Sequence, residues 1–289
     1  MTWKTLGLIA LALPITACGG GGGNDSVGNG PAAGNSDGGG SLETPVETDP
    51  VNPLQGRMGN LPHRTDATYD ASTDTLTLDL RGAPVDLTRN NFLPNINGFD
   101  QFQAAGAEAS ALRGTTASGS GSAMIVFSRA NAHDIHGVEY ERLTPGGIPV
   151  TGTATYQGEY VGLITSTSAG AAFVVQGDAT LETDFDSGSV NGRVSNRSQV
   201  VSGSDNGFFM NDLALRDGSI SGNGEFQGTV TGGQAIGDTF FSGSSTTTGS
   251  YGGAIVGATG NEAVGGVVID HEFEGVTMTE TGAFVASQP

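Results

Sequence analysis

The chain has 289 residues, including 49 glycines and a single cysteine. This length can bury a sizeable core in one or two domains. The glycines follow no triplet period, which excludes collagen, and one cysteine excludes an intramolecular disulfide and a paired-thiolate zinc site. The formal net charge is −19. Such an acidic chain repels nucleic acid and anionic lipid, so neither is expected to bind it.

The first residues have the pattern of a targeting segment. Lys4, the only lysine, precedes an apolar run at residues 6–16 that is too short to span a bilayer. The run ends in Ile-Thr-Ala-Cys, which resembles a bacterial lipobox and would make Cys18 the diacylated first residue of the mature chain. The next residue is Gly19 rather than aspartate, which by resemblance to the enterobacterial sorting pattern favours the outer membrane. We therefore expect residues 1–17 to be a signal peptide and the protein to be lipid-anchored in the outer membrane at the cell surface. The alternative is an ordinary buried cysteine in a secreted protein.

Residues 18–56 consist mostly of Gly, Asn, Ser, Asp, Pro and Glu, with almost no core-forming side chains. This composition predicts a disordered tether with a reach of about 30–35 Å. The segment contains a Gly-x-Ser-x-Gly motif at residues 34–38. A serine hydrolase needs that motif between a strand and a helix, and neither is expected here. The chain is therefore predicted not to be an enzyme.

Residues 57–150 have a mixed pattern. A clean alternation that places Leu76, Leu78 and Leu80 on one face predicts a strand over residues 75–80. A second strand is expected at residues 123–127. Apolar residues at spacings of three or four predict a short helix after Gly98, and these are Phe99, Phe102, Ala105, Ala109 and Leu112.

From residue 151 the chain becomes a series of strands with glycines on an alternating face. These are expected at residues 151–165, 171–176, 179–185, 190–194, 209–215, 220–230, 236–247, 254–256, 263–269 and 283–285. Asp217-Gly218 has the pattern of a two-residue hairpin turn. About eight strands would close into an antiparallel barrel whose interior is filled by side chains. The fold class is therefore mainly β, with a C-terminal eight-stranded antiparallel β-barrel, a smaller N-terminal domain and a preceding tether.

The apolar runs at residues 254–256 and 263–269 flank a linker rich in Gly and Asn, so they are expected to pair as an antiparallel hairpin. The adjacent Gly265 and Gly266 would let a backbone or a bulky ring approach closely. This stretch resembles the closing hairpin of the transferrin-binding protein B barrel family, with Ile-Val-Gly-Ala at residues 255–258 where the family has Phe-Tyr-Gly-Pro. Further segments with the family's order and spacing lie at residues 152–162, 181–192 and 224–228.

The resemblance implies a single lobe, with a handle domain at residues 57–150 and a barrel at 151–289. It also implies a non-enzymatic surface lipoprotein that binds an iron source, either haem or an iron-carrying protein, for uptake. The expected partners are then a TonB-type receptor or a surface lipoprotein exporter, and a host or environmental protein, haem or glycan ligand. The alternative is a surface adhesin or a protein- or glycan-binding module with no role in iron acquisition.

His133 and His136 lie three residues apart, with Tyr140 just beyond. Imidazole and phenolate are haem-iron ligands, so these three residues are the candidate ligand-binding site. On a helical turn the two histidines would share a face, whereas on a strand they would point to opposite faces. The alternative is a polar loop with solvated histidines. No metal site and no other cofactor is expected.

Overall fold

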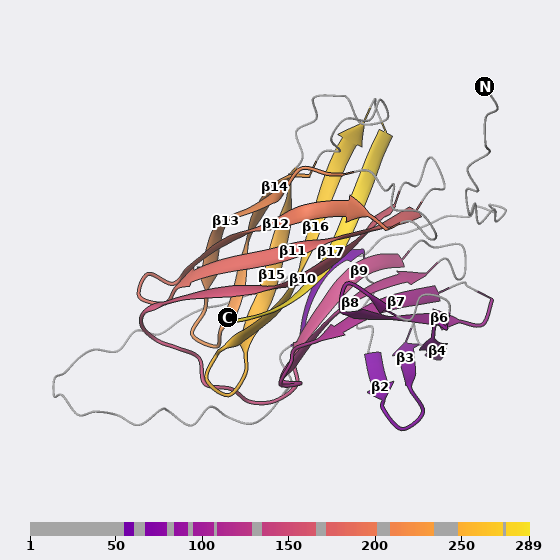
Figure 1. Cartoon of the computed structure of the whole chain (residues 1–289), viewed down its shortest axis with the longest axis horizontal. Helices are drawn as coiled ribbons and strands as arrows, with labels where there is room; N and C mark the ends of the chain where they lie inside the picture. The colour runs from indigo at the N-terminus through magenta and orange to yellow at the C-terminus, as the bar shows by residue number, and fades with distance from the viewer. Residues whose placement is uncertain are drawn as a thin grey trace, which may run out of the picture.

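The computed structural model describes residues 55–60, 67–79, 84–91, 95–106, 109–128, 135–165, 172–200, 209–233, 248–273 and 276–289. The expected signal peptide, Cys18, the tether up to residue 54, Leu80, His133 and the strand expected at 236–247 lie outside these residues. Within them every regular element is a β-strand (Figure 1). No helix able to cross a membrane is found in the described ranges.

The C-terminal strands form a closed antiparallel barrel, which confirms the predicted fold class (Figure 1). Each strand pairs with the next, and the last pairs back with the first, with Tyr160 opposite Phe284. The eight strands are β10 (Thr153–Thr165), β11 (Ala172–Asp184), β12 (Ser189–Gln199), β13 (Leu213–Ile220), β14 (Glu225–Gly232), β15 (Thr248–Val256), β16 (Glu262–Phe273) and β17 (Val276–Ser287).

The N-terminal strands form one nine-stranded sheet, which we call the handle. Its order is β1-β9-β8-β7-β6-β4-β3-β2, with β5 beside β6. The strands are β1 (Gln55–Asn60), β2 (Ala67–Asp70), β3 (Thr75–Asp79), β4 (Pro84–Arg89), β5 (Asn95–Ile96), β6 (Phe99–Ala104), β7 (Ala109–Thr115), β8 (Gly121–Ser128) and β9 (Ile135–Arg142). The strand predicted at Leu76 and Leu78 is confirmed as β3, with both leucines buried.

The predicted hairpin is formed by β15 and β16, with Gly252 opposite Gly266. Its two adjacent glycines serve opposite faces of the barrel wall. A Cβ atom added to Gly265 would lie 2.4 Å from Cζ of Phe284 inside the barrel. One added to Gly266 would lie 2.3 Å from a methyl group of Val138, which belongs to the handle outside. The hairpin therefore leaves room for the Phe284 ring to pack on its inner side and for the handle sheet to pack on its outer side.

The helix predicted after Gly98 is wrong, because that segment forms strands β6 and β7. Phe99 and Phe102, three residues apart in β6, point to opposite faces of the sheet. Phe99 packs with the cluster next to the barrel, and Phe102 packs with a cluster on the far face of the handle. Since both faces are covered, an apolar spacing of three arises without a helix.

The hairpin turn predicted at Asp217-Gly218 is also wrong. Both residues lie inside β13, where the register shifts between Arg216 and Ser219. Asp217 has a φ of 53°, and a Cβ atom on Gly218 would lie 2.0 Å from the Tyr251 hydroxyl oxygen. The pair therefore forms a β-bulge. The two strands predicted at 171–176 and 179–185 are a single strand, β11, continuous through Gly177.

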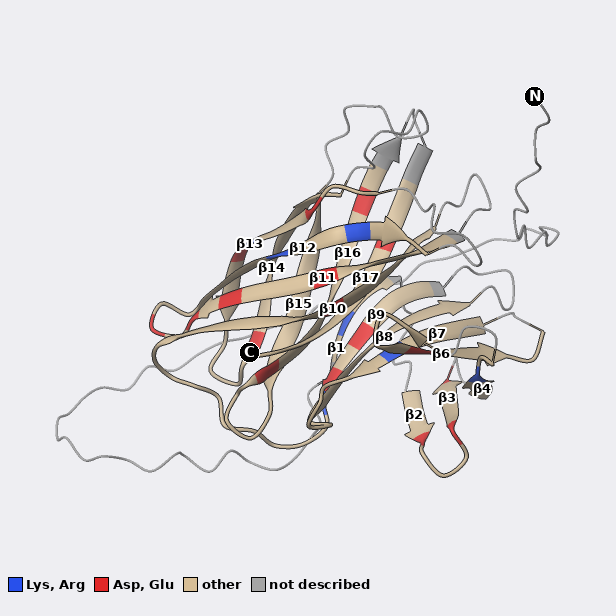
Figure 2. Ribbon diagram, in the orientation of Figure 1, with Lys and Arg blue, Asp and Glu red and all other residues tan. Residues whose placement is uncertain are grey.

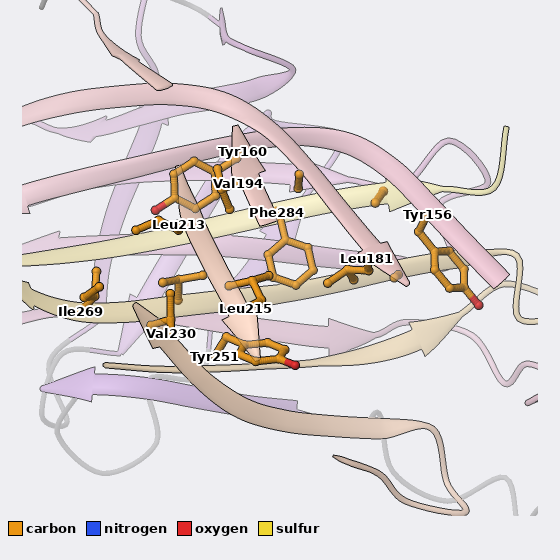
Figure 3. Close-up of a cluster of buried hydrophobic side chains, with 14 of the residues drawn as sticks. Tyr156, Tyr160, Leu181, Val194, Leu213, Leu215, Val230, Tyr251, Ile269 and Phe284 are labelled. Carbon is orange, nitrogen blue, oxygen red and sulfur yellow. The ribbon is translucent and has the colours of Figure 1, made fainter. Parts of the chain in front are cut away.

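Side chains fill the barrel interior (Figure 3). Inward residues alternate along the strands, as period-two patterning requires. The rings of Phe226 and Phe284 stack with their centroids 6.4 Å apart, and Tyr251 packs beside Phe226. Figure 3 shows aliphatic side chains from several strands, among them Leu181 and Leu215, pointing into the same space. The described part of the barrel interior is therefore a packed core.

A charged network lies in the same interior. Glu280 on β17 accepts hydrogen bonds from Arg197 Nη2 and, at 2.7 Å, from the Tyr160 hydroxyl. Its Oε2 atom is 2.8 Å from Nε2 of His271. Burial alone would raise the pKa of Glu280, but the charge of Arg197 and the contact with His271 outweigh burial and lower it to about 2. The network ties β10, β12, β16 and β17 together from within.

Replacement of Glu280 by glutamine (E280Q) should lower the free energy of unfolding by about 3–5 kcal/mol, because the Arg197 guanidinium would remain buried without its counter-ion. The measurement is urea denaturation at neutral pH. Because folding lowers the pKa of Glu280 from 4.5 to about 2, its contribution is complete above pH 4.5 and is lost as the pH falls toward 2. E280Q should therefore show a flatter acid dependence over that window. Glu182→Gln, at an exposed position of β11, is the matched control and should unfold like the wild type.

Candidate functional site

The handle packs against the outer wall of the barrel. Strands β8 and β9 lie across β16 and β17 (Figure 1). Their contact is an apolar cluster with members from both parts. The handle contributes Ile96, Phe99, Leu112, Ala123, Ile125, Val138 and Tyr140, and the barrel contributes Val161, Ala254, Val256, Val264, Ala283 and Val285.

Glu262, the first residue of β16, is held by the turn between β7 and β8 of the handle. Its carboxylate accepts hydrogen bonds from the Ser118 amide at 2.9 Å, the Ser120 hydroxyl at 2.6 Å and the Ser118 hydroxyl. Only 2% of Glu262 is exposed. Burial raises its pKa, but the hydrogen bonds from the two serines have the larger combined effect and lower it. The ionised carboxylate therefore depends on the handle for its hydrogen bonds.

Two further side chains bridge the handle and the barrel. The Arg142 guanidinium, at the end of β9, donates to the carbonyl oxygens of Asn223 and Ile255 at 2.7 and 2.8 Å. The Asn97 amide donates to the carbonyl oxygens of Tyr160 and Gly177 at 3.0 and 2.7 Å. These bonds fix the position of the handle on the wall.

Beside this contact, a groove runs between β1 and β9 of the handle and the outward faces of β13, β14 and β15. We call it the handle–barrel groove. Its main part has a volume of about 580 Å³ and is open to solvent. The groove is lined by Arg57, Met58, Gly59, Tyr140, Asp217, Ser219, Gln227, Gly228, Ser250, Tyr251, Gly252 and Val268, and it continues along Ile220, Ser221, Glu225 and Phe226.

Tyr140 is a buried polar side chain that lines this groove. Its ring fills the space over Gly56 on β1, where an added Cβ atom would lie 1.8 Å from Cζ. Its hydroxyl lies over Gly252 on the barrel wall, 3.2 Å from the position of a Cβ atom there. Tyr140 is 9% exposed. Burial, assisted by the charge of Glu225, raises its pKa to about 12. Its hydroxyl has no hydrogen-bond partner among the described residues and is accessible from the groove.

The structure separates His136 from Tyr140, two of the three residues predicted to bind a ligand. His133 lies outside the described residues. His136 and Tyr140 share the barrel-facing side of β9, but four residues of strand hold them about 13 Å apart. Nδ1 of His136 lies 3.4 Å from the Thr281 hydroxyl on β17. Of the predicted set, Tyr140 alone is a lining residue of the groove.

The barrel side of the groove was not predicted. Asp217, Ser219, Gln227 and Ser250 are exposed residues of three strands that are distant in sequence from Tyr140. In the sequence these residues are marked only as the polar positions of alternating strands. Every outward face of the barrel has such positions, so the pattern does not single them out. Among the described side chains, no three His, Cys, Asp or Glu residues are grouped as a metal site.

The sequence matches no family model and no curated protein. Among solved structures, the chain is similar to a double mutant of transferrin-binding protein B from Haemophilus parasuis. The two have 11% sequence identity and a TM-score of 0.46, and the match covers 75% of this chain and 40% of that one. For the protein from serogroup B Neisseria meningitidis, identity is 17% and the TM-score 0.45, over 76% and 40% of the two chains. The chain thus spans about two fifths of these proteins. A putative outer membrane protein of Bacteroides fragilis has 13% identity and a TM-score of 0.24 over 82% of this chain and 97% of that one. These values are too low to indicate what the chain binds.

Replacement of Tyr140 by phenylalanine should change the free energy of unfolding by less than about 0.5 kcal/mol, because its hydroxyl bonds no described residue. The matched control is Tyr156→Phe. The Tyr156 hydroxyl donates to the Gly260 carbonyl oxygen at 2.7 Å, and its loss should cost about 0.5–1.5 kcal/mol. Urea denaturation of both variants measures the difference. Equal losses would show that the Tyr140 hydroxyl is used within the fold.

Proposed function

We propose that the protein is a non-enzymatic surface lipoprotein that binds an iron source, haem or an iron-carrying protein, and presents it for uptake. The filled barrel interior carries this proposal, because it leaves the handle and the outer wall as the binding surface. There the handle–barrel groove offers a free phenol, hydroxyls, an amide and carboxylates. These groups suit recognition, and the sequence resemblance to the transferrin-binding protein B barrel family supports iron acquisition as its purpose.

Between the two iron sources, the groove favours an iron-carrying protein. A phenolate can ligate haem iron, but the raised pKa of Tyr140 disfavours that form. His136 is too far along β9 to share an iron with Tyr140. The haem version therefore depends on His136 or Tyr140 acting singly, or on His133.

The haem version is tested by titrating the mature chain with haem. If the protein binds haem, the Soret band should shift. The shift should be lost in the double variant His133→Ala/His136→Ala or in Tyr140→Phe. His63→Ala is the control and should keep the shift. A wild-type chain without a Soret shift would remove haem, and capture of an iron-loaded protein would then be the remaining version.

A second candidate is an adhesin or a protein- or glycan-binding module with no role in iron acquisition. The lining of the groove favours it, since Ser219, Ser250 and Gln227 are general hydrogen-bonding groups rather than iron ligands. Growth of a deletion strain on haem or on an iron-carrying protein as the only iron source separates the candidates. Unimpaired growth would favour the second.

Membrane attachment through Cys18 is part of the proposal, with a TonB-type receptor or a surface lipoprotein exporter as the partner. Cys18→Ser should abolish the lipid modification, detected by mass spectrometry, and release the chain from the membrane fraction. Protease added to intact cells should digest the wild-type chain if it is displayed. Complete protection would contradict surface display.

A further inference from the structure

The strand β1 is the edge of the handle sheet. Its residues Gln55–Asn60 pair with β9, and among the described strands β9 is its one partner. An edge strand presents a row of main-chain N–H and C=O groups that can pair with another strand. In β1 this edge adjoins the handle–barrel groove, which Arg57, Met58 and Gly59 line.

The groove has room for a strand at this edge. A paired strand would lie about 4.8 Å from β1, over the outward faces of β13 and β14. The lining of the groove includes the small residues Ser219, Gly228, Ser250 and Gly252, beside the longer Asp217 and Gln227. Side chains that an added strand directs at the barrel would therefore meet hydroxyl, amide and carboxylate groups.

The Tyr140 hydroxyl is an independent indication of a ligand. About nine tenths of Tyr140 is buried, and its hydroxyl has no hydrogen-bond partner in the described part of the chain. Its oxygen is not one of the buried side-chain atoms that lack a partner in the described part of the chain, so it is accessible from the groove. Because it lies next to β1 at the floor of the groove, it can donate to a carbonyl oxygen of an added strand.

The charges around the groove select a basic occupant. On the handle side, Arg57 is already matched, with its Nε atom 3.4 Å from Glu139 on β9, and Figure 2 shows this basic position of β1 beside an acidic one of β9. On the barrel side, the carboxylates of Asp217 and Glu225 line the groove. The whole chain carries a net charge of −19.

We infer that an extended, basic segment of another polypeptide adds as a strand to the free edge of β1 and lies in the handle–barrel groove. Main-chain hydrogen bonds to β1 would supply affinity, and the carboxylates of Asp217 and Glu225 would select arginine or lysine side chains. This inference rests on the proposed binding function and names the chemical class of its partner.

The test is a selection of displayed random peptides of about eight residues, enough to span the six residues of β1, against the full chain. Selected peptides should be rich in Arg or Lys. A synthetic copy with N-methylated main-chain amides should bind at least about tenfold more weakly, because it cannot pair with a strand edge. Amide exchange measured by NMR should slow in β1 when the unmodified peptide binds.

Variants of the chain locate the site. Tyr140→Phe should weaken the selected peptide about two- to tenfold, whereas Tyr156→Phe should not. The double variant Asp217→Asn/Glu225→Gln should weaken binding of the selected peptide at low salt by about two- to fivefold for each carboxylate removed. The matched control is Glu159→Gln with Glu182→Gln, at exposed positions of β10 and β11, and it should have no effect.

A selection without binders, equal binding of the N-methylated copy, or indifference to all groove variants would overturn the inference. The haem titration and the growth experiment use neither these peptides nor the edge of β1. Their outcome therefore stands or fails separately from that of the strand addition.

Discussion

The handle–barrel groove depends on the docking of the handle on the barrel wall, and the buried carboxylate of Glu262 is central to that docking. A carboxylate taken out of water is costly unless donors replace the water. Here the donors are Ser118 and Ser120, which come from the handle. If the handle moved away, the charge would lose these partners. The apolar cluster beneath β8 and β9 adds buried area to the contact. The hydrogen bonds of the carboxylate fix where the handle lies on the wall.

The β15–β16 hairpin makes this docking possible. Gly265 gives Phe284 its place inside the barrel, and Gly266 gives Val138 its place outside. Any larger side chain at either position would push the ring or the handle away from the wall. One short stretch therefore sets both the packing of the interior and the closeness of the second sheet. The groove exists because β1 and β9 are held near the wall at this distance.

The barrel could be predicted from the sequence because period-two alternation and glycine placement are local signals. The handle was harder, since a sheet covered on both faces places Phe99 and Phe102 at a spacing that also suits a helix. Asp217-Gly218 has the chemistry of a turn, but the hydroxyl of Tyr251, from a distant strand, lies against Gly218 and the pair forms a bulge. Local pattern cannot report such long-range contacts.

The same limit applies to the candidate site. The residue type of Tyr140 and its position near two histidines mark it as a candidate, yet its neighbours in the groove come from β1, β13, β14 and β15. His136 was grouped with it by sequence proximity, and the extended geometry of β9 separates them. The sequence pattern does not report the register that places the edge strand β1 beside Asp217 of the barrel.

The most direct test of this account is a double-mutant cycle between Glu262 and Ser120, measured by urea denaturation with Glu262→Gln, Ser120→Ala and the double variant. If the carboxylate positions the handle as described, the two changes should be coupled by about 1 kcal/mol or more, because Ser120→Ala removes the hydrogen bond to Glu262 and Glu262→Gln removes the charge that strengthens it. Losses that add within about 0.3–0.5 kcal/mol would contradict it.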